Sequence, residues 1–390
     1  MPRTPAFPTP VLITDTDALA ALCARLAQEP FVTIDTEFMR ERTYFPELCV
    51  VQLGGTADVA VVDTQAPDLD LAPLQALLAD TAVLKVFHAA RQDAEIFLHL
   101  FGQVPAPLFD TQVAAMVAGF GDQVGYDSLV GALSGGQIDK AHRFSDWSAR
   151  PLSPAQVAYA AADVTWLRVV YERLVAKLEA EGRLEWVREE MAVLLDPLLY
   201  RPDPDTLWER LRPRTNNRRM LGVLRAITAW REREAQRVNV PRGRLIKDES
   251  LLEIAASAPT SAEALGRVRG VTRGFAEGKG GSGLLEAVRD AVALPESALP
   301  EAARKDGPRP SPALVALLKV LLAAKGEQHH VAPKLLASSD ELDRLATEDE
   351  PDVPALQGWR REVFGADALA LKQGRIALGV DGKRIKLLPA

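Results

Sequence analysis

The stretch FVTIDTEF, residues 31–38, sets the fold expected for the first half of the chain. Its apolar beginning, with Val and Ile, predicts a strand over residues 31–35. Asp35 and Glu37 lie two positions apart, so in an extended strand both carboxylates point to the same face. Like charges at the end of an apolar strand repel each other in a low dielectric, and a divalent cation would offset that repulsion. A strand that leaves the core for a polar loop would carry the same residues, so both interpretations stay open here.

Alternating strands and helices are predicted around this stretch. Three short, Val-rich runs predict further strands: LCVVQL (48–53), VAVVD (59–63) and VLKVF (83–87). Between and after them, two runs are typical of helices: LAPLQALLAD (71–80) and AEIFLHLF (94–101). This order predicts an α/β domain in which helices pack on a sheet.

A third carboxylate lies in KVFHAARQDAEIF, residues 85–97. The predicted strand ends near Phe87 and a helix begins at about Arg91, which places Asp93 in the first turn of that helix. An acidic residue there complements the helix dipole, so Asp93 taken alone has an ordinary structural explanation.

The fourth carboxylate lies in RPLSPAQVAYAAADVTWL, residues 150–167. Ser153 followed by Pro154 predicts an N-cap with proline at the first helical position. Tyr159 and Asp163 are then one turn apart on one face. An apolar side lies roughly opposite, formed by Val157, Ala161 and Val164. Taken alone, a core tyrosine and a surface aspartate would account for the pair.

Together, the four carboxylates are hard oxygen ligands suited to two Mg²⁺ or Mn²⁺ ions. Such an ion pair can clamp the attacking and leaving oxygens of a phosphoryl displacement. In this order the motifs resemble those of the DEDD exonucleases, in the subclass with a tyrosine before the last aspartate. The resemblance is closest to the ribonuclease D family, and four stretches carry it: TEFMRERTYFPELCVVQL (36–53), FHAARQDAEIFL (87–98), FDTQVAAMVAGF (109–120) and IDKAHRFSDWSARPLSPAQVAYAAADVTWL (138–167).

The resemblance covers residues 12–200 and implies an RNase H-like exonuclease domain over residues 1–200, with a mixed sheet flanked by helices. It implies that the metal ligands are Asp35, Glu37, Asp93 and Asp163. Tyr159 would orient the attacking water or help to deprotonate it. Because a phenol has a pKa near 10, metal activation should do most of the deprotonation. Ala158 stands where the histidine subclass has its histidine. His88, near the second motif, could approach substrate or be a satisfied loop histidine.

Beyond about residue 200 the strand signal fades, and residues 216–238 and 248–257 have helical spacing. Residues 205–292 resemble an HRDC module on the stretch LRAITAWREREAQRVNVPRGRLIKDESLLEIA. The expected fold is therefore the α/β domain followed by two all-α HRDC-type domains. The remaining segments are a Pro-rich linker (293–311), a divergent second HRDC-like domain containing GWRREVF (312–372), and a tail (373–390) that alternates around Asp-Gly as a hairpin does.

Residues 278–283, GKGGSG, resemble a phosphate loop only superficially. They lack the G-x-x-x-x-G-K-[ST] order and follow no clear strand, so we expect a flexible turn.

The net charge of −7 hides a basic zone. Residues 201–247 contain thirteen Lys and Arg against five Asp and Glu, a local balance of +8. This zone lies in the first HRDC-like domain and predicts contacts with nucleic-acid phosphates. A solvated helical surface would have a similar charge. The candidate contacts are Arg218, Arg219, Arg225 and Arg231.

Other features concern the compartment of the protein. No apolar run is long enough to span a bilayer, and Pro and Asp interrupt the start of the chain where a secretory signal needs apolar residues. Cys23 and Cys49 form no CxxC pair, so we expect buried thiols and a cytoplasmic protein.

We therefore expect a 3′→5′ exoribonuclease that releases nucleoside 5′-monophosphates, acts as a monomer and needs no small-molecule cofactor. The resemblance implies RNA with a free 3′ end, and precursor tRNA in particular, as substrate. One alternative is a DNA 3′→5′ exonuclease of the same fold, since no contact to a 2′-OH is identifiable. Another is a catalytically dead RNA-binding protein, against which stands the presence of all four carboxylates.

Overall fold

The computed structural model describes residues 7–139, 141–301 and 310–390. The chain divides into two compact units. The first unit comprises residues 1–37, 49–196 and 307–390, and the second unit comprises residues 38–48 and 197–306. Among the described residues, no helix is both long enough and apolar enough to cross a membrane.

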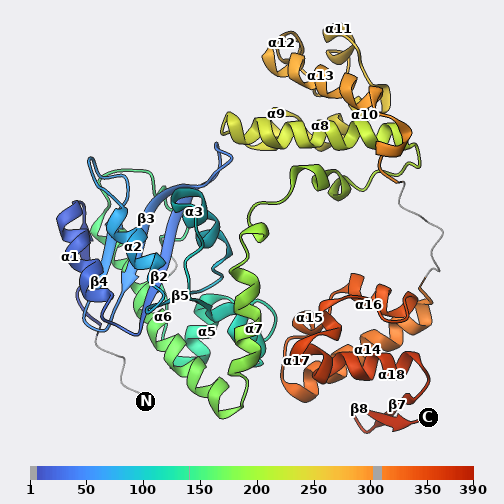
Figure 1. Ribbon diagram of the computed structural model, residues 1–390. Helices are drawn as coiled ribbons and strands as arrows, with labels where there is room; N and C mark the ends of the chain where they lie inside the picture. The colour runs from blue at the N-terminus through green and yellow to red at the C-terminus, as the bar shows by residue number, and fades with distance from the viewer. Residues whose placement is uncertain (1–6, 140, 302–309) are drawn as a thin grey trace. The chain divides into compact units, whose positions relative to one another are not determined.

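A six-stranded sheet forms the centre of the α/β part, in the order β1-β4-β3-β2-β5-β6 (Figure 1). The pairs β1–β4, β2–β5 and β5–β6 are parallel, whereas β3–β4 is antiparallel, which confirms the predicted mixed sheet. The strands are β1 (Val11–Ile13), β2 (Phe31–Met39), β3 (Glu47–Gly54), β4 (Val59–Asp63), β5 (Leu84–Phe87) and β6 (Leu108–Asp110). All four predicted strands are present, and β2 extends four residues beyond its predicted end.

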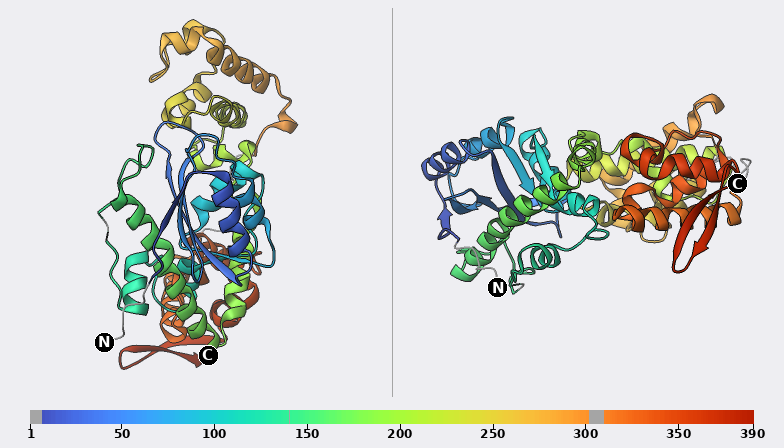
Figure 2. Two further views of the ribbon diagram at one scale, coloured as in Figure 1. Left: turned by 90° about the vertical axis from the view of Figure 1, so that its left-hand side faces the viewer. Right: turned by 90° about the horizontal axis from the view of Figure 1, so that it is seen from below.

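In the described part of this domain, the sheet is accompanied by helices α1 (Thr16–Leu26), α2 (Ala72–Ala79), α3 (Arg91–Phe101), α4 (Thr111–Val117), α5 (Tyr126–Ser134), α6 (Pro154–Ala180) and α7 (Leu184–Leu194). Helices α1 and α2 pack together on one face, and α6 runs along the other face against β4 and β5 (Figure 2). The start of α6 is as predicted: Ser153 caps it, Pro154 is its first residue, and Gln156 completes a capping box.

Gly54 allows α6 to approach the sheet closely. A Cβ atom on Gly54 would lie 2.4 Å from Thr33 Oγ1 and 3.2 Å from Val164 Cβ. The Thr33 hydroxyl lies 2.8 Å from the main-chain oxygen of Val164, to which it donates a hydrogen bond. These contacts fix the position of α6 at the residue that follows Asp163.

The first unit also contains a helical bundle, residues 310–372, which we call the C-terminal bundle. Its elements are α14 (Pro312–His329), α15 (Pro333–Leu336), α16 (Ser339–Thr347), η4 (Pro354–Leu356), α17 (Gly358–Arg360), the π-helical turn η5 (Arg361–Gly365) and α18 (Ala366–Lys372). Leu318, Leu336 and Phe364 are fully buried in its core.

Residues of the GWRREVF stretch fasten the C-terminal bundle to α7. The Trp359 indole donates a hydrogen bond to Glu190 at 3.0 Å, and the Arg360 guanidinium donates to the other oxygen of Glu190 at 2.6 Å. The rings of Trp186 and Trp359 stack with centroids 4.8 Å apart. Glu190 is only 6% exposed, so its charge is compensated within this contact.

The predicted C-terminal hairpin is present. Strands β7 (Ile376–Asp381) and β8 (Arg384–Pro389) pair antiparallel, with Asp381 opposite Arg384. Gly382 in the turn has a φ of 61°, a conformation that glycine adopts without strain.

The second unit is mainly helical. Its elements after residue 196 are η1 (Pro197–Leu199), η2 (Pro204–Leu211), α8 (Arg218–Arg237), α9 (Arg242–Leu245), α10 (Asp248–Ser257), α11 (Ala262–Leu265), α12 (Arg273–Glu277), α13 (Lys279–Ala293) and η3 (Glu296–Ala298). Helix α8 packs against η2, α10 and α13, around a core that includes Val223, Ile227 and Leu284.

The segment between β2 and β3 belongs to this second unit. The Tyr44 hydroxyl donates a hydrogen bond to Glu232, which is 1% exposed and also accepts from Arg242 at 2.9 Å. The side-chain oxygen of Asn239 accepts from the main-chain N–H groups of Tyr44 and Phe45, at 3.0 and 3.1 Å. Residues 38–48 are thus anchored to α8 and the loop that follows it.

Two predictions for this region need correction. GKGGSG is not a flexible turn, because α13 begins at Lys279 and includes its remaining residues. Its glycines permit close packing: a Cβ on Gly281 would lie 2.3 Å from the main-chain oxygen of Ala276. The predicted linker is also not free at its start, because η3 is followed by Leu299, which is 5% exposed. Residues 302–309 of that predicted linker lie outside the described residues.

Candidate active site

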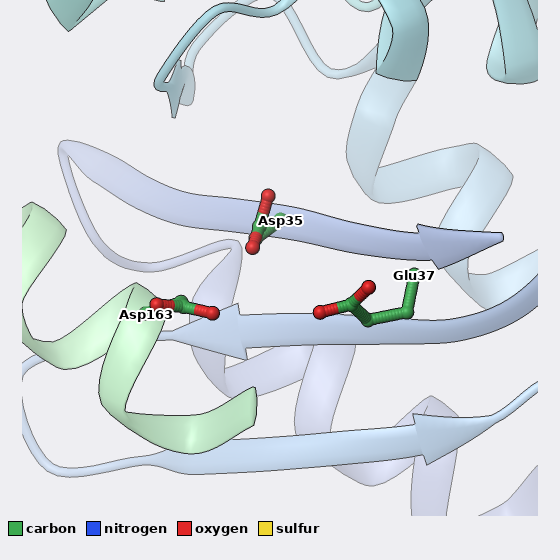
Figure 3. A group of neighbouring side chains, drawn as sticks. All are labelled: Asp35, Glu37 and Asp163. Carbon is green, nitrogen blue, oxygen red and sulfur yellow. The ribbon is translucent and has the colours of Figure 1, made fainter. Parts of the chain in front are cut away.

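Three carboxylates converge where β2 meets α6. Asp35 and Glu37 project from β2 and Asp163 from α6, and one oxygen of each lies within 4.8 Å of the others (Figure 3). The two-residue strand spacing predicted the shared face of Asp35 and Glu37, and the resemblance to the family implied that Asp163 joins them.

The electrostatics of this group favour a cation. Burial raises the pKa of Asp35 well above its ordinary value, and the charge of Asp163 raises it further. Burial, followed by the charges of Asp35, Asp163 and Asp93, raises the pKa of Glu37 to about 9. Burial raises the pKa of Asp163 to about 7. Buried oxygens that repel one another when ionised fit a hard divalent ion such as Mg²⁺ or Mn²⁺.

Asp93 lies beside this group but is held differently. It is in the first turn of α3, as predicted, and is 6% exposed. Its carboxylate accepts a hydrogen bond from the hydroxyl of Thr36, the residue between Asp35 and Glu37. Burial and then the charge of Asp35 raise the pKa of Asp93. The structure therefore brings the fourth carboxylate to the same region, and its role as a metal ligand stays a prediction.

Asp110 supports the turn that leads to Asp93. Its carboxylate caps α4 and accepts from the main-chain N–H groups of Ala89 at 3.0 Å and Ala90 at 2.9 Å. Ala89 has a φ of 59°, an unfavourable conformation for alanine that these bonds help to maintain. The role of Asp110 was not predicted, although Asp-Thr-Gln after a short apolar run is a recognisable capping signal.

Tyr126 was also not predicted. Its hydroxyl donates a hydrogen bond to the main-chain oxygen of Asp163 and so supports the helical turn that carries this carboxylate. Its ring lies 5.1 Å from that of His88. Burial lowers the pKa of His88 to about 4, and its Nδ1 lies 3.0 Å from the Thr111 hydroxyl, so His88 is a neutral member of the site.

Tyr159 lies one turn before Asp163 and is half-buried. Burial, followed by the charges of Asp163, Glu37 and Asp35, raises the pKa of its phenol. The phenol is therefore protonated at neutral pH, which favours an orienting role over that of a base. Its ring centroid lies 6.0 Å from both His142 and Trp147.

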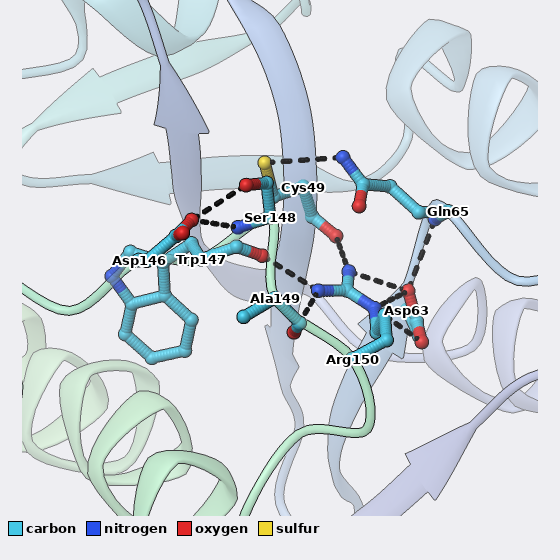
Figure 4. A network of polar contacts seen from close by, with 8 residues as sticks. All are labelled: Cys49, Asp63, Gln65, Asp146, Trp147, Ser148, Ala149 and Arg150. Carbon is cyan, nitrogen blue, oxygen red and sulfur yellow. Dashed lines mark hydrogen bonds and ion pairs between the residues drawn. The ribbon is translucent and has the colours of Figure 1, made fainter.

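An arginine clamp fixes the loop before α6 (Figure 4). The Arg150 guanidinium pairs with Asp63 at 2.6 Å and donates to the main-chain oxygens of Cys49 at 2.9 Å and Trp147 at 2.6 Å. This clamp ties the loop to β3 and β4, and Trp147, only 2% exposed, packs near Tyr159. Cys23 and Cys49 are both buried, as predicted.

These groups line a cavity of about 380 Å³. Its walls include the three carboxylates, Tyr126, Tyr159 and Arg143. Such a cavity can hold a terminal nucleotide beside hard oxygen ligands and a protonated phenol.

Comparisons with known proteins agree with this site. Residues 10–179 match the family described as 3′-5′ exonuclease, and residues 220–288 match the HRDC domain. The chain is 72% identical to ribonuclease D of Gluconacetobacter diazotrophicus over 385 residues, 98% of each chain. This chain belongs to the ribonuclease D family. Ribonuclease D of Acidiphilium cryptum is 66% identical over 389 residues, which cover 100% of this chain and 99% of that one.

Solved structures of the family extend the comparison. The crystal structure of Escherichia coli RNase D, described as an exoribonuclease involved in structured RNA processing, matches with a TM-score of 0.81 and 32% identity over 94% of this chain and 99% of that one. The catalytic core of RRP6 from Trypanosoma brucei, at 24% identity, shares the fold with a TM-score of 0.55. As a ribonuclease D, the chain is a hydrolytic 3′→5′ exoribonuclease, which confirms the predicted enzyme class.

The arginines predicted to contact nucleic acid have hydrogen-bond partners within the protein, and a phosphate contact of Arg218, Arg219 and Arg225 stays a prediction. Arg231 is 4% exposed; it pairs with Asp248 at 2.7 Å and donates to the main-chain oxygen of Ile246, so its predicted phosphate contact is wrong. The guanidinium groups of Arg218, Arg219 and Arg225 donate to main-chain oxygens between residues 292 and 300. They stabilise the C-terminal end of α13 and the segment after it, because carbonyls there lack helical partners.

Other basic residues of the zone are exposed. Among the described residues, these have no ion pair: Arg210, Arg212, Arg214, Arg244 and Lys247. Arg233 and Arg237 are also exposed but pair with Asp205 and Glu234. Sequence composition located the basic zone, but it could not separate arginines that bind main-chain oxygens from those that face solvent.

Proposed function

We propose that this ribonuclease D removes nucleotides from the free 3′ end of RNA with two Mg²⁺ or Mn²⁺ ions held by Asp35, Glu37, Asp93 and Asp163. The observation that carries this proposal is the convergence of three carboxylates, one buried and two half-buried, with oxygens within 4.8 Å of one another. Bound ions would activate the attacking water and neutralise the charge that develops on the phosphate. The products are nucleoside 5′-monophosphates.

The protein's own groups position the reactants. The Tyr159 phenol keeps its proton and donates a hydrogen bond that orients the attacking water. Thr36 and Tyr126 hold the acidic groups through Asp93 and the main chain of Asp163. Such pre-set positions reduce the reorganisation required in the transition state.

We propose precursor tRNA as a physiological substrate, since the E. coli relative is described as acting in structured RNA processing. The exposed basic residues without an ion pair in the zone 201–247, such as Arg210, Arg212 and Arg214, would contact its phosphates. Two buried thiols, Cys23 and Cys49, suit a reducing compartment, and we place the protein in the cytoplasm as a monomer. The assignment of residues 312–372 as a second HRDC-like domain remains part of this proposal.

The test is incubation of full-length protein with 3′-labelled RNA and matched DNA in Mg²⁺, Mn²⁺ or EDTA. The expected result is stepwise release of labelled mononucleotide from RNA, abolished by EDTA and by Asp163→Asn. Equal or faster degradation of DNA would make the protein a DNA exonuclease of the same fold. Unchanged activity in EDTA would rule out the proposed two-metal mechanism.

A further inference from the structure

A cationic and an aromatic side chain stand together at the edge of the active-site cavity. Phe144 is 92% exposed, the highest value among the described large hydrophobic side chains. The guanidinium carbon of Arg143 lies 5.5 Å from the centre of its ring. Arg143 itself lines the cavity that holds Asp35, Glu37 and Asp163. Neither residue was singled out in the sequence, although both lie in a stretch that resembles the family.

The surroundings give Arg143 a specific electrostatic position. Among the described residues that line the cavity, it is the one arginine or lysine, and His88 is neutral. The other ionisable groups that line the cavity, apart from two tyrosines, are carboxylates, none of which can donate a charged hydrogen bond to a phosphodiester. Arg143 also has no ion pair within the described part of the chain, unlike Arg150 and Arg168 nearby in sequence. Its charge is therefore available to an anion in the cavity.

The turn that carries both residues is attached to the site. The main-chain N–H of Ser145 donates to the oxygen of His142 at 3.0 Å, which closes the turn. The His142 ring lies 6.0 Å from Tyr159, and the Arg150 clamp holds the chain just beyond. Phe144, in contrast, projects from this turn and is 92% exposed, which leaves the ring face away from Arg143 accessible.

We propose that Arg143 and Phe144 form a subsite for the 3′-terminal segment of single-stranded RNA. Arg143 contacts a phosphate at the cavity, and the ring of Phe144 stacks on a base beside it. Stacking depends little on base identity because every base has a π-face. This suits an enzyme that must accept each nucleotide in turn. The inference rests on the proposed function and deepens it by assigning substrate contacts.

The test uses full-length protein with Mg²⁺ and single-stranded RNA of mixed sequence, and compares Phe144→Ala with Phe144→Trp. Phe144→Ala should raise KM about 5- to 100-fold while kcat changes little, since stacking is worth about that much per base. Phe144→Trp should retain the wild-type KM. RNA with an abasic ribose at each of the last three positions in turn identifies the stacked base. At that position, removal of the base should raise the KM of the wild-type enzyme by the same factor. It should not raise the KM of Phe144→Ala any further.

Arg143 is tested in parallel. Arg143→Ala should lower kcat/KM about 10- to 100-fold, as expected when a charged hydrogen bond is lost. Arg143→Lys should recover part of the loss because it keeps the charge but not the two-pronged geometry. Arg188→Ala and Val380→Ala are matched controls, since these side chains are 73% and 74% exposed away from the cavity.

Two outcomes would overturn the subsite. One is an unchanged KM in Phe144→Ala and Arg143→Ala; the other is an abasic penalty that persists fully in Phe144→Ala. RNA affinity in an Asp163→Asn background gives a readout that does not require hydrolysis. If wild type fails to degrade RNA, the proposed function fails, whereas the affinities of the Phe144 and Arg143 variants still decide the subsite.

Discussion

The hydroxyl of Thr36 donates a hydrogen bond to the carboxylate of Asp93. Thr36 stands between Asp35 and Glu37 on β2, so a single strand supplies two acids of the site and also orients a third. Thr36→Val keeps the shape of the side chain but removes this bond. Loss of an outer partner of a metal ligand typically costs about 10- to 100-fold in metal affinity or activity. We expect the Mg²⁺ concentration for half-maximal activity to rise, and Thr36→Ser to recover most of the effect. A Thr36→Val titration that overlays wild type would show that Asp93 needs no such support.

Asp35→Asn and Asp163→Asn should each lower the hydrolysis rate by at least about 100-fold, since in the proposed site each changes a direct ligand rather than an outer partner. RNA binding should persist, because the exposed basic residues are untouched. Single-turnover rates and RNA affinity, measured on the same preparations, separate the two effects. Wild-type turnover in either variant would rule out the proposed ligand set.

The metal-free protein should lose stability as pH rises. Folding raises the pKa of Asp163 to about 7 and that of Glu37 to about 9, from 3.8 and 4.5. Between about pH 4 and pH 9 the folded state therefore binds more protons than the unfolded state, and the free energy of unfolding falls with rising pH.

In EDTA, Tm should drop by at least about 3 °C between pH 5.5 and pH 8.5, given about 2–4 °C per kcal/mol for a chain of 150–250 residues. The drop in Tm should be smaller in Asp163→Asn. For the wild-type protein at pH 8.5, addition of Mg²⁺ should reverse the drop in Tm. An equal drop in Asp163→Asn would place the titrating groups elsewhere.

Tyr159→Phe should slow hydrolysis by about 10²- to 10⁴-fold, the usual range for a positioned proton donor or acceptor. RNA affinity should change little, because the phenol acts on the water rather than on the substrate backbone. The measurement is the rate constant at saturating RNA. If that constant is unchanged, Tyr159 serves only to pack against His142 and Trp147.

The exposed part of the basic zone should set the salt dependence of RNA binding. Replacing Arg210, Arg212 and Arg214 together by Ala should lower affinity and reduce the slope of log K against log salt by about 2, at roughly 0.7 per phosphate contact. The control with equal charge change replaces Arg188, Arg267 and Arg273, all exposed and paired with glutamates. If log K depends on log salt with the same slope in both triple variants, the basic zone is only a solvated surface and does not contact RNA. Arg218→Ala, by contrast, should lower stability because its guanidinium binds main-chain oxygens.

The spacing of apolar residues predicted the long helices and strands of the fold. It did not predict the short elements or the residues that meet through tertiary contacts. β2, β3 and β4 carry runs of four apolar or β-branched residues, and in β5 only Lys85 interrupts the apolar pattern. β1 and β6 have three residues each and give no pattern. Strand and helix spacing predicted only which faces Asp35, Glu37 and Asp163 share with their neighbours, and the order of the motifs, which resembles that of the exonuclease family, marked them as candidate metal ligands. Tyr126 and Arg143 reach the site through tertiary packing, which no local spacing encodes. The prediction that Arg231 contacts phosphates was wrong for the same reason. The partners that hold it in the interior lie 15 and 17 residues further along the chain.

The bond between Tyr44 and Glu232 determines how the protein can be dissected. A fragment that ends near residue 200 keeps every acid of the catalytic group but lacks Glu232, Asn239 and Arg242. Residues 38–48 would then lose their anchorage, and this segment begins immediately after Glu37. Weak activity in such a fragment could therefore result from a loosened strand β2 as well as from the loss of RNA contacts, and the experiment would not separate the two causes. Point substitutions in the intact chain are the cleaner way to assign function to the helical half of this ribonuclease.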